Sequence, residues 1–280
     1  MSTVQTDEGF FRNPTSDHRL FYRLWQPAAS KALVVIVHGF GEHSGRYAAL
    51  AHALAQRQLA VACADLWGHG RSAGRRGDSE RFGQYLDDLE ALTTQTFLPR
   101  TRKEGFAIFG HSFGGLAAIH WALRNPQRLR CLMLQSPLLG VGFPVPRWKA
   151  RLAELIRRWW PTLAFPIGLD PRGLSHDPDV VQRYRNDPLI HDRITLRSYD
   201  ALETAMREGV EQATRIATPT LLLYGSEDRV ISLTACQAFA AQLTCEKRVI
   251  HFPDCYHELH HEPALPRVIE EISGWVHAHP

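Results

Sequence analysis

The chain has 280 residues, of which 44% are hydrophobic and 22% are charged, an ordinary balance for a globular protein with a substantial core. The formal net charge of +3 includes arginines scattered along the chain, so the charge pattern does not predict a nucleic-acid partner. The N-terminal residues do not look like a signal peptide, no apolar run is long enough to span a bilayer, and the five cysteines are widely spaced, so we expect a protein of a reducing, cytoplasmic compartment.

Segments with the apolar pattern of buried strands alternate with amphipathic helical segments along most of the chain. Two strands are predicted first, at residues 8–13 and 19–26. Six more strand-like segments follow at residues 33–37, 59–64, 106–109, 131–135, 220–224 and 247–252. This alternation predicts an α/β fold, with a mostly parallel central sheet and helices on both faces. Ligands of such sheets bind beyond the carboxyl ends of the strands.

The alternation is interrupted at residues 137–199, which are rich in proline, tryptophan and arginine. We therefore expect a core made of residues 1–136 and 200–280, with residues 137–199 inserted as a cap over the edge of the sheet. Within the cap, residues 147–160 predict a helix with an apolar stripe and five basic side chains. Such a helix can lie on an anionic lipid surface, or it can pack on the core with its arginines in water.

The strongest functional pattern of the chain is at residues 106–119. A short apolar run is followed by Gly110-His111-Ser112-Phe113-Gly114 and then by a helix-forming segment. A strand, the Gly-x-Ser-x-Gly pattern and a helix form a nucleophile elbow, in which the serine hydroxyl projects from a sharp turn. The crowded backbone of that turn explains the glycines two residues before and two residues after the serine. Ser112 is therefore the candidate nucleophile.

A serine nucleophile needs a base and an acid that orients the base, and on this fold both follow the serine on loops after later strands. Asp228 follows the seventh predicted strand and His257 follows the eighth, so we predict that they are the acid and the base. Three other residues are better explained by structural roles. Glu227 fits a solvated loop carboxylate, His111 fits packing beside the serine, and Asp65 fits a loop brace.

Two backbone N–H groups are expected to stabilise the oxyanion that forms during attack. One belongs to Phe113, the residue after the nucleophile, at the positive end of the helix dipole. The other comes from the loop after the strand at 33–37. Phe40 is the best candidate there, because Gly39 and Gly41 let the loop fold close to the site.

These motifs occur in the order found in a known family. The segments are HGFGEHSGRY (38–47), DLWGHGRSAG (65–74), GHSFGG (110–115), NDPL (186–189), LLLYGSEDRV (221–230) and CYHELHHE (255–262). Together they resemble the monoacylglycerol lipase and lysophospholipase group of α/β-hydrolases. The resemblance implies Ser112, Asp228 and His257 as a catalytic triad, with Phe40 and Phe113 as oxyanion donors. It also implies a small lipid ester as substrate and a mobile, lipid-facing cap, through which we expect peripheral contact with a membrane.

The sequence thus predicts a serine ester hydrolase that forms an acyl-enzyme on a lipid monoester such as monoacylglycerol or lysophospholipid, with no cofactor and no metal. A serine peptidase, an amidase or a general carboxylesterase of the same fold is the alternative. A more distant alternative is a zinc hydrolase, since the segment from His257 and Glu258 to His261 matches H-E-x-x-H. That motif needs a helix, and Pro253 and Pro263 leave room for little more than one turn.

Overall fold

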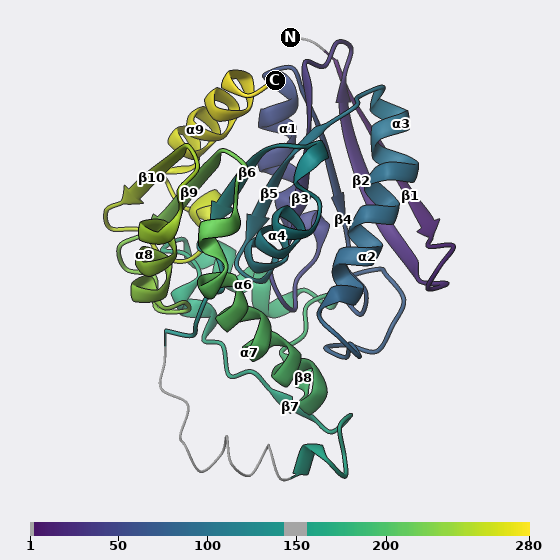
Figure 1. Ribbon diagram of the computed structural model, residues 1–280, viewed down its shortest axis with the longest axis vertical. Coiled ribbons are helices and arrows are strands. Elements are labelled where there is room, and N and C mark those ends of the chain that lie inside the picture. Colours follow the sequence, from purple (N-terminus) through teal and green to yellow (C-terminus); the bar gives the residue numbers. More distant parts are fainter. Residues whose placement is uncertain (1–2, 143–155) are drawn as a thin grey trace.

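The computed structural model of the protein describes residues 3–142 and 156–280. Its centre is an eight-stranded sheet in the order β1-β2-β4-β3-β5-β6-β9-β10 (Figure 1). The strands are β1 (Val4–Arg12), β2 (Arg19–Pro27), β3 (Ala32–Val37), β4 (Leu59–Ala64), β5 (Phe106–His111), β6 (Leu129–Gln135), β9 (Thr220–Gly225) and β10 (Lys247–Phe252). β2 pairs antiparallel to both of its neighbours, and the strands from β4 to β10 in this order pair parallel. The predicted α/β fold with a mostly parallel sheet is confirmed.

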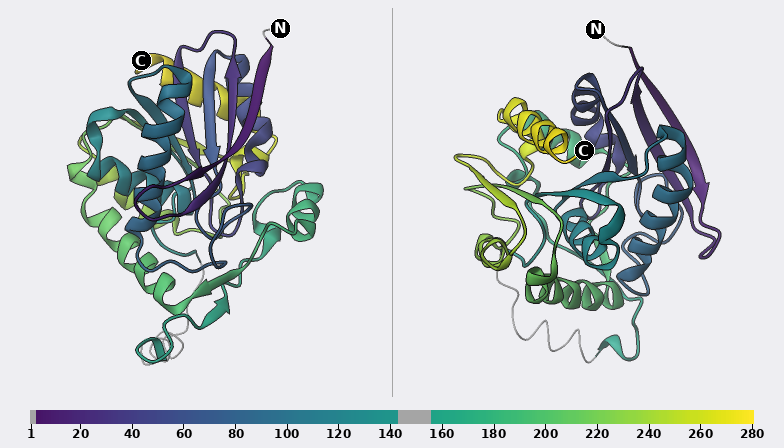
Figure 2. Two further views of the ribbon diagram at one scale, coloured as in Figure 1. Left: turned by 90° about the vertical axis from the view of Figure 1, so that its right-hand side faces the viewer. Right: turned by 45° about the horizontal axis from the view of Figure 1, so that its top comes forward.

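Helices cover both faces of this sheet (Figure 2). The α-helices given by the described residues are α1 (Ala48–Gln56), α2 (Gly83–Leu92), α3 (Leu98–Thr101), α4 (Phe113–Arg124), α6 (Pro178–Asn186), α7 (Leu196–Glu211), α8 (Leu233–Gln242) and α9 (Leu265–Ala278). Apolar side chains of α1 and α9 form the core on one face, and those of α2, α4, α7 and α8 form the core on the other. The predicted helices on both faces are therefore present.

The alternation of side chains along β3 supplies both cores. Leu33, Val35 and Val37 pack on the side of α2 and α4, while Val34 and Ile36 pack on the side of α1 and α9. A strand that is buried on both faces has no polar face, so it is a continuous apolar run in the sequence. Its carboxyl end, where the run stops, is where polar side chains gather.

The described part of the segment predicted as a cap lies beyond the carboxyl ends of the parallel strands, at the end of the molecule opposite the two termini (Figure 1). It includes helix α6 and a small antiparallel sheet of β7 (Ala164–Pro166) and β8 (Arg193–Thr195). Most of the helix predicted at 147–160 lies outside the described residues. Helix α7 runs across the predicted boundary between residues 199 and 200. The division of the chain into core and cap stays a prediction.

Polar contacts fix the second half of the cap segment to loops of the core. His43 Nε2, in the loop after β3, lies 2.9 Å from Asp187 Oδ2. The Arg197 guanidinium donates to both carboxylate oxygens of Asp78, in the loop after β4, at 2.8 and 2.7 Å. These contacts place the cap segment over the sheet edge where the candidate residues lie.

Candidate active site

Ser112 lies at the sharp turn between β5 and α4. Its backbone φ of 53° falls in the left-handed region, which is costly for a residue with a side chain. A Cβ atom added to Gly114 would lie 2.6 Å from the carbonyl oxygen of His38, and one added to Gly110 would lie 2.7 Å from the Cα of Gly115. The turn therefore requires glycine on both sides of Ser112, as the elbow pattern predicts.

Asp228 and His257 face each other from the loops that follow the neighbouring strands β9 and β10. The distance from His257 Nδ1 to Asp228 Oδ2 is 2.7 Å, and both side chains are buried. The other carboxylate oxygen, Oδ1, accepts hydrogen bonds from the backbone N–H groups of Val230 and Ile231 at 2.9 and 3.2 Å. A carboxylate held in this way favours the tautomer with hydrogen on Nδ1 and leaves Nε2 able to accept a proton.

Charges and hydrogen bonds together outweigh burial in setting the pKa of both groups. Burial acts to lower the pKa of His257, but the charge of Asp228, its hydrogen bond and the charges of Glu258 and Glu42 raise that pKa above its ordinary value. Burial acts to raise the pKa of Asp228, but the charge of His257 and the hydrogen bonds to Oδ1 and Oδ2 hold it below its ordinary value. The pair can therefore stabilise an imidazolium next to an ionised carboxylate.

The two residues predicted to supply oxyanion donors lie together. Phe113 is the first residue of α4, so its N–H has no acceptor within the helix. Phe40 follows β3, the neighbour of β5 in the sheet, and the rings of Phe40 and Phe113 meet edge to face with centroids 5.4 Å apart. The loop of Phe40 is held by the cap segment, because the N–H of His191 donates to the Gly41 carbonyl oxygen at 2.9 Å.

Ser112, His257 and Phe40 line a cavity of about 630 Å³. Much of its wall consists of aliphatic and aromatic side chains from the cap segment: Ile156, Leu163, Phe165, Ile167, Leu174 and Ile194. Asp228 is buried behind His257 and does not line the cavity. A cavity of this size and lining can bury an alkyl chain beside a serine hydroxyl.

A buried cluster of charges beside His257 was not predicted from the sequence. The Arg46 guanidinium contacts the carboxylate of Glu42, and its Nη1 and Nη2 donate to the two oxygens of Glu258 at 2.6 and 2.7 Å. Burial acts to raise the pKa of both carboxyl groups, but the charge of Arg46 lowers both below their ordinary values. In the sequence, only the position of Glu258 directly after His257 indicates this cluster. Its partner Arg46 lies 212 positions away, so no local pattern connects the two residues.

The other candidates from the sequence have structural surroundings. The buried Asp65 carboxylate accepts two backbone N–H groups at 2.8 and 2.7 Å, so it braces the loops around it. The ring of His111 lies 4.7 Å from that of His257, and burial lowers the pKa of His111 to about 4, so it is neutral at neutral pH. The Glu227 side chain is 41% exposed, as expected for a solvated carboxylate.

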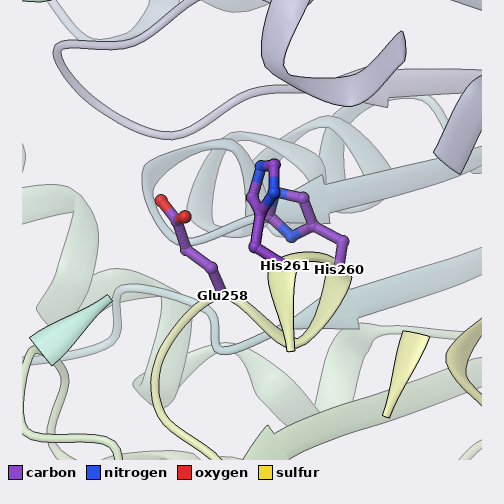
Figure 3. A group of neighbouring side chains, drawn as sticks. All are labelled: Glu258, His260 and His261. Atoms are coloured by element: carbon purple, nitrogen blue, oxygen red, sulfur yellow. The ribbon is translucent and has the colours of Figure 1, made fainter. Parts of the chain in front are cut away.

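Glu258, His260 and His261 project from the same short turn, with possible ligand atoms within 4.8 Å of one another (Figure 3). Both carboxylate oxygens of Glu258 are bound by Arg46, however, and the positive charge of Arg46 opposes a cation at this place. The helix required by H-E-x-x-H is also not formed, since His257 precedes the 3₁₀ turn η6 (Leu259–His261) and contacts Asp228. The residues therefore do not fit a zinc site of that type.

The fold and the geometry at the sheet edge define an α/β-hydrolase. The chain matches the family described as serine aminopeptidase, S33, over residues 28–264, and it belongs to this family. It is 34% identical to the monoglyceride lipase of Homo sapiens, an alignment that covers 92% of this chain and 86% of that protein. It is 31% identical to the monoglyceride lipase homolog of Monkeypox virus, covering 92% of this chain and 94% of that protein.

A solved structure also matches the chain over nearly its whole length. The crystal structure of the Paleococcus ferrophilus monoacylglycerol lipase matches with a TM-score of 0.84 and 29% identity, covering 99% of this chain and 100% of that chain. The resemblance predicted from the motifs is confirmed at the level of the family.

Proposed function

We propose that the protein hydrolyses lipid monoesters such as monoacylglycerol or lysophospholipid, with Ser112 as the nucleophile, His257 as the base and Asp228 as the acid that orients it. The observation that carries this proposal is one large, mostly apolar cavity lined by Ser112 on its strained turn and by His257, whose ring contacts the buried Asp228. The names of the relatives, monoglyceride lipase and monoacylglycerol lipase, support a lipid ester as substrate.

The proposed reaction has two halves. His257 Nε2 takes the hydroxyl proton as Ser112 Oγ attacks the ester carbonyl carbon, and Asp228 stabilises the imidazolium. The N–H groups of Phe40 and Phe113 donate to the oxyanion. The tetrahedral intermediate then collapses, the alcohol leaves with the proton from His257, and an acyl-enzyme remains. In the second half His257 takes a proton from water, which attacks the acyl carbon, and the fatty acid leaves as Ser112 regains its proton.

The cavity favours a long acyl group over a peptide. An aminopeptidase, the activity in the family's description, needs an acceptor for the free α-amino group of its substrate. The carboxylates of Glu42 and Glu258 line the cavity, but Arg46 occupies them. The large aliphatic and aromatic part of the wall contributes free energy of binding only to an apolar substituent.

A covalent probe and a substrate panel test this proposal. An active-site phosphonate should add to Ser112, located by peptide mapping, and Ser112→Ala should lose nearly all turnover while its circular dichroism is unchanged. Rates on monoacylglycerols, lysophospholipids, short p-nitrophenyl esters and aminoacyl amides should be highest for a long-chain monoester. An adduct on another serine would refute the nucleophile, and the highest rate on an aminoacyl amide would favour the aminopeptidase.

We also propose that residues 137–199 act as a cap that contacts a membrane surface peripherally. No helix within residues 3–142 and 156–280 is long and apolar enough to cross a bilayer. Trp159, Trp160 and Leu163 are 73%, 66% and 50% exposed, and the neighbouring Arg158 is exposed too. Exposed aromatic rings next to basic side chains are typical of surfaces that lie on anionic lipid. Leu163 also lines the cavity, so a lipid at this surface would be close to the proposed nucleophile.

A further inference from the structure

Glu258 is a second carboxylate beside His257, and the proposed reaction does not use it. It follows His257 directly in the chain and is 2% exposed. Its side chain projects from the turn at η6 (Figure 3), and both of its oxygens accept hydrogen bonds from Arg46, at 2.6 and 2.7 Å. A buried carboxylate is costly unless it is paired, so this bidentate contact fixes the position of the Glu258 side chain.

The partner of Glu258 connects it to the opposite side of the site. Arg46 also contacts the carboxylate of Glu42, and Glu42 Oε1 accepts the backbone N–H of Gly39 at 2.6 Å. Gly39 precedes Phe40, the proposed oxyanion donor. One guanidinium therefore links the loop that carries the proposed base to the loop that carries a proposed oxyanion donor.

The cluster also sets the charge around His257. The charged and titratable groups that face His257 come from its own segment, from the segments after β3 and β9, and from the last residue of β5: Glu258, His260, Glu42, Arg46, Asp228 and His111. Burial lowers the pKa of His111 to about 4 and that of His260 well below its ordinary value, so both imidazoles are neutral at neutral pH. Two carboxylates and one guanidinium then leave one net negative charge in addition to Asp228.

We propose that Glu258 is a positioning residue for His257. Through Arg46 and Glu42, Glu258 fixes the base relative to the oxyanion loop, and its charge stabilises the imidazolium formed in the transition state. This inference rests on the proposed function of Ser112 and His257. Its two parts, position and charge, are separable by substitution.

Glu258→Gln and Glu258→Asp, assayed on a short soluble ester across a range of pH, test the inference. Glu258→Gln removes the charge and weakens the contact with Arg46, so we expect kcat to fall roughly 10- to 100-fold with little change in KM. The acid limb of the pH profile, where kcat/KM falls as His257 becomes protonated, should move to lower pH, because His257 then stays neutral at lower pH. Glu258→Asp keeps the charge and shortens the side chain, so kcat should fall while the acid limb stays in place.

Glu262→Gln is the matched control. Glu262 is buried in the same segment, and its carboxylate accepts the backbone N–H groups of Tyr256 and His176 at 3.2 and 3.1 Å. A loss of loop stability alone would affect both Gln variants, whereas only Glu258→Gln should move the acid limb. If Glu258→Gln does not fold, Glu42→Gln removes a charge from the same guanidinium and should give the same shift.

Two results would overturn the inference. One is an acid limb of Glu258→Gln, or of Glu42→Gln in its place, that coincides with that of wild type, and the other is an equal shift of the acid limb in Glu262→Gln. A wild-type protein that hydrolyses none of the esters would instead refute the proposed function. Hydrolysis by wild type is therefore measured first, and it separates the two failures.

Discussion

At His257 the effects of burial and charge on the pKa oppose each other, and charge prevails. The pKa is raised above the ordinary histidine value, about 6.5. Only the neutral imidazole can take the Ser112 proton, so kcat/KM should fall as the pH drops through this raised pKa. Asp228→Asn removes the largest charge that raises the pKa, so the acid limb should move to lower pH and kcat should fall by a factor on the order of 10³–10⁴. Steady-state kinetics on a soluble ester across pH measures both quantities.

The control for this prediction is Glu227→Gln, next to Asp228 in the chain. The Glu227 side chain is 41% exposed and makes no hydrogen bond to His257 among the described contacts, so its loss should leave kcat and the acid limb unchanged. An Asp228→Asn variant with wild-type kcat, or a Glu227→Gln variant as impaired as Asp228→Asn, would contradict the assignment of the acid.

Ser112, Asp228 and His257 could be proposed from the sequence because each follows a buried strand and carries a local pattern or a fixed place in chain order. The pair of Arg46 and Glu258 could not. Its members lie 212 positions apart, and the contact depends on how two loops meet at the sheet edge. No local pattern encodes such a contact, so its role had to be inferred from the structure.

Among the elements, the turn between β5 and α4 has the least room for change. A Cβ on Gly114 would overlap the carbonyl oxygen of Val37, so Gly114→Ala must displace β3 or the elbow. We expect a loss of about 1–3 kcal/mol in the free energy of unfolding and slow phosphonate labelling of Ser112. Urea denaturation and labelling kinetics measure the two effects.

Gly274→Ala is the matched control for the elbow. Gly274 lies in helix α9, is exposed, and has nothing within 4 Å of an added Cβ. Alanine favours a helix over glycine by about 0.5–1 kcal/mol, so this variant should be slightly more stable and should label at the wild-type rate. Equal behaviour of the two variants would show that the crowding at Gly114 has no functional effect.

Element bounds were predictable where strands are buried on both faces. The strand at residues 59–64 was predicted with the bounds of β4, because the run is apolar throughout and ends at a polar loop. β1 begins at Val4, earlier than the predicted residue 8, because this edge strand alternates between partly buried and exposed positions and its first residues give no apolar run. β7 and β8 are three residues long, too short for a periodic pattern.

On the whole molecule, much of the large exposed apolar surface is concentrated beside the cavity. Among the described residues, three of the five large hydrophobic side chains that are exposed belong to one stretch of the cap segment: Trp159, Trp160 and Leu163. The sequence offered both an apolar stripe and basic side chains for contact with lipid, but Arg157 forms an ion pair with Asp200 and is only partly available. Among the described residues, the exposed indoles of Trp159 and Trp160 are therefore the clearest candidates for contact with lipid.

If this stretch lies on lipid, Trp159→Ala combined with Trp160→Ala should weaken binding to anionic vesicles on the order of tenfold or more, because each indole then no longer removes apolar area from water. Hydrolysis of vesicle-held monoacylglycerol should slow in proportion, while the rate on a short soluble ester should stay at the wild-type value, since Ser112, Asp228 and His257 lie on core loops. Added salt should weaken vesicle binding of both proteins equally, because it screens the basic side chains and not the apolar contact.

Phe10→Ala on β1, an exposed aromatic residue outside the cap segment, is the control and should bind like wild type. Vesicle co-sedimentation with parallel rate measurements separates the cases: unchanged vesicle binding, or an equal loss on the soluble ester, would mean that the indoles only support the cap.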